Sequence, residues 1–428
     1  MKNALDILEE RGFLYQFTDY DTLKKHLAEG PVAFYVGFDP TADSLHIGHL
    51  LPVMAMRVLQ SCGHKAIALV GGATAMVGDP SGKTEARPVL AREEIDANAE
   101  AIKKQLSRFL DFSDDRAILV NNADWLAPLN YIEFLREAGR HFSVNRMLQM
   151  ESVKLRLDTG GLSFLEFNYM LLQAYDFAVL SESHGCTLQL GGQDQWGNIV
   201  AGIDLTRRMH QREVYGATFP LLLKADGEKF GKTASGAVWL DQSRTSPYEY
   251  YQFWRNVEDS DVERLLAMFT TLPMDEVKRL AALEAPAINR AKEILAFEAT
   301  RLAHGAPEAE KAYQAAGSEF GFADPDGSIS TSSDVRKIEA KKQRDDLPTH
   351  VISVDDLDEG IWIVQLFVDA GLGQSNGEVR RLIRGGGCYL NDSRIEDEKR
   401  QVTAADLADG EILLRAGKKK ICRVVASG

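Results

Sequence analysis

Apolar runs of strand length alternate with helix-length segments along the first half of the chain. Strand-like runs are expected at residues 32–38, 66–71, 117–121, 187–191 and 218–223. Helix-length segments lie between most of these runs, and two amphipathic helices are expected within residues 3–30. Strands that alternate with helices favour a doubly wound α/β fold with a parallel sheet, which binds ligands beyond the carboxyl ends of its strands. Candidate chemistry is therefore sought in the loops after these runs.

The first of these loops joins the run at residues 32–38 to a helix start. The run ends in the turn sequence Asp-Pro-Thr at residues 39–41, in which proline fixes φ and the Asp and Thr side chains bond to nearby backbone. The sequence His-Ile-Gly-His follows at residues 46–49 and opens a helix-like stretch. A strand, a loop and a helix start bring backbone N–H groups and a positive dipole end to a phosphate. An isolated H-x-G-H is weak sequence evidence, but its position after this run strengthens it.

Two Gly-Lys-Thr sequences, at residues 82–84 and 231–233, end like the P-loops of kinases and other nucleotide triphosphatases. A P-loop also needs a glycine five residues before its Gly-Lys-Thr, and these positions hold Val77 and Asp226. The nearest glycine misses that position by one residue in both loops. A P-loop enzyme is therefore the rival class, and both loops fail its motif.

A helix expected at about residues 163–180 carries Tyr169, Gln173 and Asp176 at i, i+4 and i+7, which places them on one stripe. This stripe could be an ordinary solvated polar face. Apolar side chains cover the rest of the helix, however, and a helix that is apolar all round is buried. Buried polar groups need hydrogen-bond partners, and a polar ligand fits this need better than an internal network.

Two further loops carry groups suited to a nucleotide. In the sequence GGQDQ, Asp194 and Gln195 follow two glycines that allow close backbone approach, although a glycine turn with an Asp helix cap is an equally simple interpretation. The sequence KFGKT presents Lys229, Lys232 and Thr233, that is, two ammonium groups and a hydroxyl. A solvated charged turn is the alternative.

The composition limits the class of protein. A chain of 428 residues is expected to form two or three domains, and its apolar runs are too short to span a membrane. The acidic N-terminus is unlike a signal peptide, and four widely spaced cysteines indicate neither a zinc site nor a disulfide framework, which suits a cytoplasmic protein. The net charge of −14 argues against unspecific nucleic-acid binding. Residues 360–428 contain 11 Lys+Arg against 9 Asp+Glu, a net of +2, which leaves −16 to residues 1–359.

The second half of the chain is expected to be helical at about residues 245–320, and residues 328–348 are polar and charged like a linker. An apolar helix is expected at residues 361–370, followed by a second helix capped by Ser375 and then by strand-like sequences. Arginines on this second helix and lysines in a later β-turn predict a compact basic face for RNA phosphates. The candidate RNA-binding residues are Arg380, Arg381, Arg384, Lys418, Lys419 and Lys420.

The motif at residues 46–49 matches HIGH, the first signature of class I aminoacyl-tRNA synthetases, letter for letter. KFGKT resembles their second signature, KMSKS, with both lysines in register and departures at Phe230, Gly231 and Thr233. These motifs, the GDPSGK loop, the YMLLQAYD helix and GGQDQWGN occur in the order found in bacterial-type tyrosyl-tRNA synthetases, and the resemblance extends over essentially the whole chain.

The resemblance implies a Rossmann-like catalytic domain at residues 1–224. It further implies a KFGKT loop with an α-helical domain that binds the anticodon stem at 225–325, a linker at 326–357, and a small α+β S-four-type RNA-binding domain at 358–428. A homodimer and a cytoplasmic location are also implied.

The resemblance implies that L-tyrosine is activated by ATP to tyrosyl-adenylate and then transferred to tyrosine tRNA. ATP arrives with Mg²⁺, and neither a tightly bound cofactor nor a resident metal is expected. The implied catalytic residues are Thr41, His46, His49, Lys83, Arg87, Lys229, Lys232 and Thr233. Tyrosine is expected to be bound by Tyr35, Asp79, Tyr169, Gln173 and Asp176, and ATP by Gly37, Asp39, Gly48, Gly192, Asp194, Gln195 and Lys232.

Two alternatives belong to other classes. One is a nucleotidyltransferase that has H-x-G-H but no amino acid pocket, and the polar stripe together with the basic tail argues against it. The other is an RNA-binding relative that has lost catalysis, and the intact histidines and loop lysines argue against that.

Overall fold

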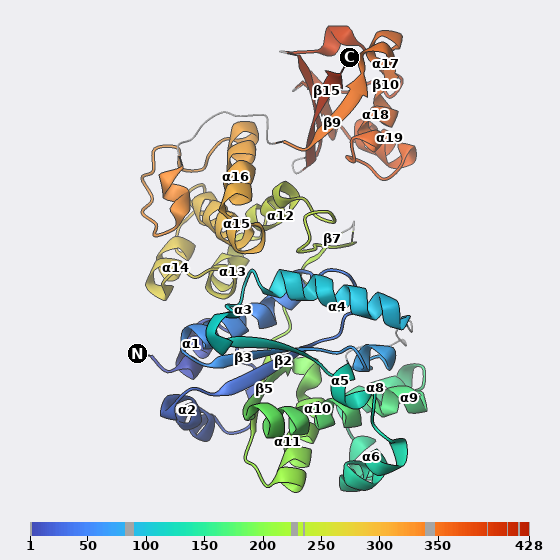
Figure 1. The fold of residues 1–428 in the computed structure, drawn as a ribbon. Coiled ribbons are helices and arrows are strands. Elements are labelled where there is room, and N and C mark those ends of the chain that lie inside the picture. The colour runs from blue at the N-terminus through green and yellow to red at the C-terminus, as the bar shows by residue number, and fades with distance from the viewer. Residues whose placement is uncertain are drawn as a thin grey trace. The chain divides into compact units, whose positions relative to one another are not determined.

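The computed structural model describes residues 2–81, 90–223, 230–233, 236–338, 347–391, 393–408, 410–417 and 420–427. The chain forms two compact units (Figure 1). Unit 1 comprises Met1–Ser246, Val257–Leu283 and Leu302–His304, and unit 2 comprises Pro247–Asn256, Glu284–Arg301 and Gly305–Gly428. The chain therefore passes between the units more than once, whereas the sequence suggested domains that follow one another.

Unit 1 is built on a six-stranded sheet with the order β1-β6-β5-β2-β3-β4. Its strands are β1 Gln16–Phe17, β2 Ala33–Phe38, β3 Lys65–Val70, β4 Ala117–Asn121, β5 Cys186–Gly192 and β6 Tyr215–Phe219. All neighbours pair in parallel except β1, which runs antiparallel to β6. The doubly wound parallel sheet predicted from the sequence is confirmed.

Helices cover both faces of this sheet, with α3 and α4 on one side and α10 and α11 on the other (Figure 1). The helices up to α11 are α1 Ala4–Glu10, α2 Tyr20–Glu29, α3 Ile47–Ser61, α4 Arg92–Leu106, α5 Ala123–Leu126, α6 Tyr131–Glu137, α7 Val144–Met147, α8 Glu151–Thr159, α9 Phe164–Phe167, α10 Tyr169–His184 and α11 Trp196–His210. None of the described helices is long and apolar enough to cross a membrane.

Three details of unit 1 differ from the sequence prediction. The last predicted run, 218–223, is displaced to Tyr215–Phe219. The two-residue strand β1 was not anticipated, because two residues are too few to show a periodic pattern. The helix predicted at 163–180 is divided at Asn168, whose side-chain amide donates to the carbonyl of Phe164 (2.7 Å). This break sets the start of α10, which carries the polar stripe.

The helical region predicted after residue 245 is confirmed. It contains α12 Pro247–Arg255, α13 Val262–Phe269, α14 Met274–Ala281, α15 Ile288–His304 and α16 Ala306–Phe320. α13 and α14 belong to unit 1, whereas α12, α16 and most of α15 belong to unit 2.

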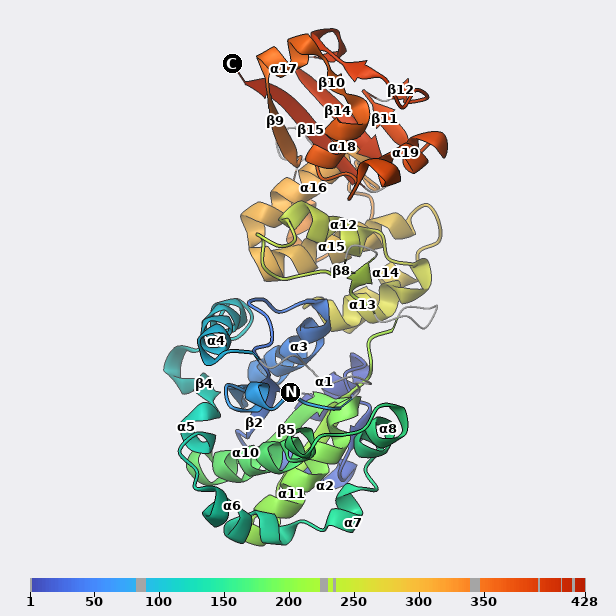
Figure 2. The same ribbon diagram turned by 90° about the vertical axis from the view of Figure 1, so that its right-hand side faces the viewer.

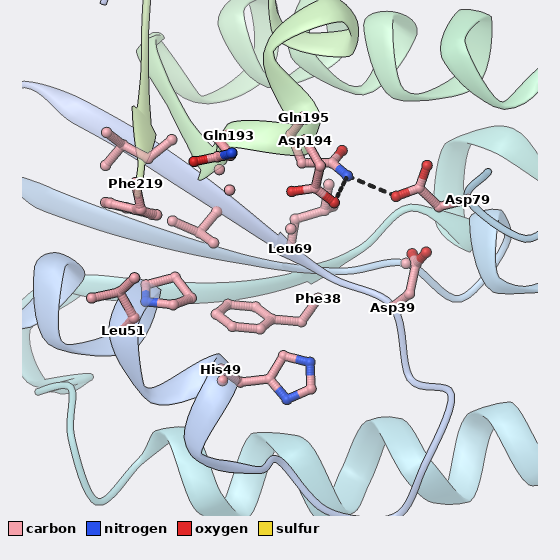
Figure 3. Close-up of a pocket in the computed structure, with 18 of the residues that line it drawn as sticks. Phe38, Asp39, His49, Leu51, Leu69, Asp79, Gln193, Asp194, Gln195 and Phe219 are labelled. Carbon is pink, nitrogen blue, oxygen red and sulfur yellow. Dashed lines mark hydrogen bonds between the residues drawn. The ribbon is translucent and has the colours of Figure 1, made fainter. Parts of the chain in front are cut away.

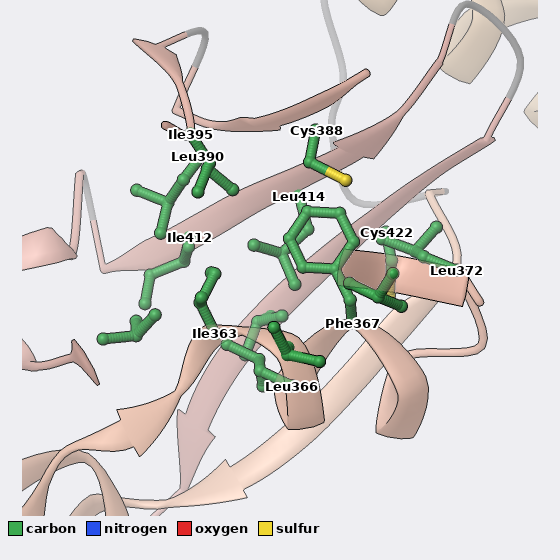
Figure 4. Close-up of a cluster of buried hydrophobic side chains, with 14 of the residues drawn as sticks. Ile363, Leu366, Phe367, Leu372, Cys388, Leu390, Ile395, Ile412, Leu414 and Cys422 are labelled. Atoms are coloured by element: carbon green, nitrogen blue, oxygen red, sulfur yellow. The ribbon is translucent and has the colours of Figure 1, made fainter. Parts of the chain in front are cut away.

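The end of the chain forms a five-stranded sheet with the order β12-β11-β14-β15-β9. Its strands are β9 Thr349–Ser353, β11 Cys388–Leu390, β12 Ser393–Arg394, β14 Glu411–Ala416 and β15 Lys420–Ser427, and its helices are α17 Val354–Glu359, α18 Ile363–Asp369 and α19 Asn376–Arg384. α18 and α19 lie over one face of the sheet (Figure 2). Phe367, Leu414 and Cys422 belong to the apolar cluster between them (Figure 4). β9 and most of α17 fall inside the range expected to be linker. β9 belongs to the sheet because it pairs in parallel with β15.

Candidate active site

A cavity of about 380 Å³ opens at the carboxyl ends of β2 and β5 (Figure 3). β2 is followed in the chain by β3 on one side, whereas β5 and β6 lie on its other side. The cavity therefore occupies the point at which the strand order reverses, where open α/β sheets bind their ligands. The structure brings to this cavity the predicted residues Tyr35, Gly37, Asp39, Thr41, His46, Gly48, His49, Asp79, Tyr169, Gln173, Asp176, Gly192, Asp194 and Gln195.

The two histidines of HIGH form the start of α3. Nδ1 of His46 accepts the N–H of Gly48 (3.0 Å), and Nδ1 of His49 accepts the N–H of His46 (3.2 Å), so the pair makes a reciprocal cap. The rings stack with their centroids 3.9 Å apart. A Cβ on Gly48 would lie 2.8 Å from Cε1 of His46, so only glycine admits this ring. Because each Nδ1 accepts a hydrogen bond, each neutral imidazole carries its proton on Nε2.

The base of the KFGKT loop packs against this helix start. Gly231 has a φ of +85°, and a Cβ there would lie 3.2 Å from Cβ of Ile47. KFGKT has glycine at position 231, where KMSKS has serine. This glycine permits the left-handed backbone conformation and the close packing against HIGH. Lys232 and Thr233 form β7, which pairs with β8 Gly236–Ala237.

Asp176 lies at the bottom of the cavity and is 1% exposed. Its Oδ1 accepts the indole N–H of Trp125 (2.8 Å), and its Oδ2 accepts the amide of Asn122 (3.0 Å). Burial raises the pKa of Asp176 to about 7, against the opposing effect of these two donors. The carboxyl group is thus oriented by two neutral donors, one from the residue that caps α5 and one from α5 itself.

The hydroxyl of Tyr35 is buried within electrostatic reach of this carboxyl group and has no hydrogen-bond partner within the described part of the chain. Its pKa is raised well above the usual range, first by burial and then by the charge of Asp176. An unpartnered buried hydroxyl costs free energy, and a ligand with a polar end could supply the missing bond.

Five further polar side chains line the cavity. The hydroxyl of Tyr169 donates to Oδ2 of Asp39 (2.9 Å), and the hydroxyl of Thr74 donates to Oδ1 (2.9 Å). Gln195 donates to Oδ2 of Asp79 (2.7 Å, Figure 3). The pKa of Asp79 is raised to about 6, chiefly by burial and further by Asp39. Buried carboxyl groups that face a cavity can receive a cationic ligand group.

Asn198 joins two of the residues that line the cavity. Its amide donates to Gln173 (2.9 Å) and to Gln195 (3.2 Å). A Cβ on Gly192 would lie 2.5 Å from Oδ1 of Asp194, so the exposed Asp194 side chain folds back over this glycine.

Several predicted residues cannot be placed. Lys83, Arg87, Lys229, Lys418 and Lys419 lie outside the described residues, and for Lys232 and Thr233 only the backbone is described. Their roles stay predictions.

Sequence reasoning missed the residues that orient the site, namely Thr74, Asn122, Trp125 and Asn198. It also missed Gln189, which lines the cavity. Asn122 directly follows a predicted strand, and this position was a usable signal. Trp125 gave no such signal in the sequence, because its partner Asp176 lies 51 residues away.

In the C-terminal sheet domain, Arg380, Arg381 and Arg384 are exposed on α19. Arg384 makes a bidentate ion pair with Glu398 (2.9 and 3.0 Å), and the guanidinium of Arg380 lies 5.1 Å from the ring centre of Trp362. Lys420 is exposed at the start of β15. Two of the three arginines are therefore held by partners on the protein.

No group of three or more His, Cys, Asp or Glu side chains suited to a metal occurs among the residues that the structure describes.

The whole chain is similar to known proteins. Residues 27–321 match the family model of class I tRNA synthetases (W and Y), and residues 339–424 match the model of the tyrosine–tRNA ligase SYY-like C-terminal domain. The tyrosine–tRNA ligase of Desulfosudis oleivorans is 52% identical over 99% of both chains, and that of Clostridium tetani is 51% identical over 99% of both.

Solved structures of tRNA synthetases are also similar to this chain. A C-terminally truncated mitochondrial tyrosyl-tRNA synthetase of Aspergillus nidulans is 33% identical with a TM-score of 0.66, covering 73% of this chain and 93% of that one. A tryptophanyl-tRNA synthetase of Giardia lamblia, 15% identical with a TM-score of 0.54 over 78% of this chain and 89% of that one, shares the fold. The chain belongs to the class I tRNA synthetases and, within them, to the tyrosine–tRNA ligases.

Proposed function

We propose that this protein activates L-tyrosine with ATP to tyrosyl-adenylate and pyrophosphate, and then transfers tyrosine to the 3′-terminal adenosine of tyrosine tRNA. The observation that carries the proposal is the unpartnered hydroxyl of Tyr35 within electrostatic reach of the buried Asp176, at the bottom of a cavity at the switch point of the sheet. A phenol hydroxyl can donate to Asp176 and accept from Tyr35. Phenylalanine cannot supply these bonds.

The ammonium end of tyrosine is proposed to lie among the polar side chains around Asp79. Asp79 and Gln173 line the cavity together with Tyr169, whose hydroxyl is turned toward Asp39. The ammonium of tyrosine would compensate the negative charge of Asp79, which burial otherwise destabilises. Tyrosine is thus assigned to the inner part of the cavity.

ATP is assigned to the outer part, with Mg²⁺ as its substrate complex. Asp194 and Gly192 would hold the adenosine together with Gln195, and Gly37, Asp39 and Gly48 line the same space. Thr41 also lines the cavity and is exposed.

The first reaction needs no general base, because the tyrosine carboxylate is already a nucleophile. It attacks the α-phosphorus, and the bond to pyrophosphate breaks. The protein has to align this attack and stabilise the charge that develops on the phosphates. Nε2–H of His46 and of His49 are proposed as donors for this task, since each Nδ1 accepts a backbone N–H. Lys83, Arg87, Lys229, Lys232 and Thr233 are proposed to bind the departing pyrophosphate.

The C-terminal domain, from β9 to β15, is proposed to bind tyrosine tRNA. Its arginine-bearing helix α19 and Lys420 are exposed, and the rest of the chain is strongly acidic. RNA phosphates would be drawn to this part of the protein.

A homodimer is proposed from the exposed apolar side chains of helices α6–α9. The inner faces of these helices share one buried cluster, which includes Phe134, Met147 and Val153. Their outer side chains are exposed although they are large and apolar, and this is typical of an interface. These exposed side chains are Tyr131, Ile132, Val144, Leu148, Leu155, Leu157, Phe164 and Leu165. The cysteines are free thiols, which accords with a proposed cytoplasmic location.

The test is ATP–pyrophosphate exchange measured with each of the twenty amino acids in turn. Exchange that depends on tyrosine and rejects phenylalanine is expected. Equal exchange with both amino acids, or none with tyrosine, would contradict the proposal.

A further inference from the structure

A buried polar pair lies behind the HIGH motif and outside the cavity. Ser44 precedes HIGH and is 2% exposed, and Gln105 lies in the last turn of α4 and is 4% exposed. The amide of Gln105 donates to the hydroxyl oxygen of Ser44 (3.1 Å), and its Oε1 accepts the N–H of Leu45 (2.8 Å). Neither member of the pair lines the cavity, so the mechanism above leaves both without a role.

The pair joins two segments that are distant in the sequence. The hydroxyl oxygen of Ser44 also accepts the N–H of Asp241 (3.2 Å). Beside it, the N–H of Leu240 donates to the carbonyl of Leu45 (2.8 Å), and the N–H of Ile47 donates to the carbonyl of Val238 (3.0 Å). The residues before HIGH and the segment 238–241 are thus held in register.

The segment 238–241 continues into the KFGKT loop. The N–H of Val238 donates to the carbonyl of Gly231 (3.0 Å), and Gly231 packs against Ile47 at the first residue of α3. A shift of segment 238–241 relative to Leu45 would therefore move the base of KFGKT relative to HIGH.

We infer that Ser44 and Gln105 are positioning residues for tyrosine activation, because they fix the register between the two signature motifs. Groups that stabilise a transition state must be held to well within 1 Å, and a buried amide with both ends bonded restricts motion more than an exposed contact does. The same two segments are also joined on the surface by the ion pair of Asp43 with Arg244, but both side chains are more than a third exposed, so this link is weak.

The experiment rests on the proposed function and compares Gln105→Leu and Ser44→Ala with a matched control, Gln60→Leu. Gln60 in α3 is 5% exposed, and its amide bonds to the backbone of Asp111 at both ends (2.7 and 2.9 Å), away from the cavity. The Gln60 amide also donates to the carbonyl of Arg116 (3.2 Å). Gln105→Leu and Gln60→Leu therefore both remove a buried amide that is bonded at both ends. For each variant, the rate of tyrosyl-adenylate formation, the dissociation constant for tyrosine and the unfolding midpoint are measured.

A positioning role predicts that Gln105→Leu slows tyrosyl-adenylate formation by about ten- to a hundredfold, while the dissociation constant for tyrosine changes by less than about twofold. Ser44→Ala, which creates no large cavity, should also slow tyrosyl-adenylate formation without weakening tyrosine binding, but to a lesser degree. Gln60→Leu should lower the unfolding midpoint to a similar extent and leave the rate within about twofold.

If Gln105→Leu does not fold, the rate of tyrosyl-adenylate formation in Ser44→Ala tests the positioning role. A normal rate in the folded variants, an equal loss of rate in Gln60→Leu, or a parallel loss of tyrosine affinity would overturn the positioning role. If the unmodified protein forms no tyrosyl-adenylate, the proposed function is overturned as well, so the two failures are distinguishable.

Discussion

The indole N–H of Trp125 donates to Oδ1 of Asp176 over 2.8 Å and joins residues 51 positions apart in the chain. With Asn122 on the other oxygen, the carboxyl group is oriented before any ligand enters. The proposed selectivity for tyrosine therefore depends on side chains that need not touch the substrate.

Trp125→Phe removes one donor and keeps an aromatic ring. A hydrogen bond to a charged group contributes roughly 1.5–3 kcal/mol, so the dissociation constant for tyrosine should rise by about ten- to a hundredfold, with ATP affinity unchanged. Equilibrium binding measures both constants. Trp362→Phe is the control, because that indole donates to the carbonyl of Glu398 in the C-terminal domain (2.7 Å) and should leave tyrosine affinity unchanged. Equal effects of the two variants would contradict this account.

Tyrosine binding should weaken as the pH falls. Asp176 has a pKa of about 7 and Asp79 of about 6, and a ligand that donates to both needs them ionised. Below pH 7 binding must first expel a proton, so the dissociation constant should rise by roughly tenfold per pH unit, and more steeply below pH 6. Titration between pH 5.5 and 8.5 measures this. A constant affinity over that range would contradict it.

The same shifts predict the opposite trend for the free energy of unfolding. Aspartates in the unfolded chain lose their protons near pH ~4, whereas Asp176 and Asp79 keep theirs to about pH 6–7 in the folded protein. The folded state binds more protons in this window, so the free energy of unfolding should decrease as the pH rises through it. Asp176→Asn should reduce this slope in denaturant titrations of the ligand-free protein.

His46 both caps α3 and carries a proposed donor to the phosphates. Asparagine is a good helix cap, so His46→Asn should keep the unfolding midpoint but lose Nε2–H. Removal of one such donor costs about 3–4 kcal/mol of barrier, so tyrosyl-adenylate should form about a hundred- to a thousandfold more slowly, with tyrosine affinity retained. Single-turnover rates test this. A variant that binds tyrosine poorly and activates it normally would show that His46 is misassigned.

A chain that ends near Pro348 should exchange pyrophosphate normally but charge tRNA poorly, because the cut precedes β9 and removes the C-terminal sheet as a whole. Arg381→Ala should impair charging more than Arg384→Ala, since Glu398 already neutralises Arg384. Charging assays at several salt concentrations compare these variants. Full charging by the truncated chain would contradict an RNA-binding role.

The proposed dimer can be tested at Phe164, which is 71% exposed. A charge at this position would have to be buried at the interface, so Phe164→Glu should shift the protein toward monomers. Val351→Glu is the control, because that residue is 57% exposed in the C-terminal domain. Light scattering gives the molar mass. A monomeric unmodified protein, or no shift in Phe164→Glu, would contradict the dimer.

The sequence by itself determined the parallel sheet, the helix starts and most residues of the cavity. Alternating strand and helix patterns are local, and residues that follow strands collect at one edge of a parallel sheet, so Asp39, His46 and Gly192 could be placed there from their positions alone. The stripe from Tyr169 to Asp176 followed from helical spacing.

Only the tertiary structure decided which side chains orient this site. Trp125 bonds to Asp176, and Gln105 bonds to Leu45, across 51 and 60 residues. Strand β9 likewise exists because β15 pairs with it, although the sequence suggested a linker there. Such contacts between distant residues depend on how the elements pack in three dimensions, and the local periodicity of the sequence does not contain that information.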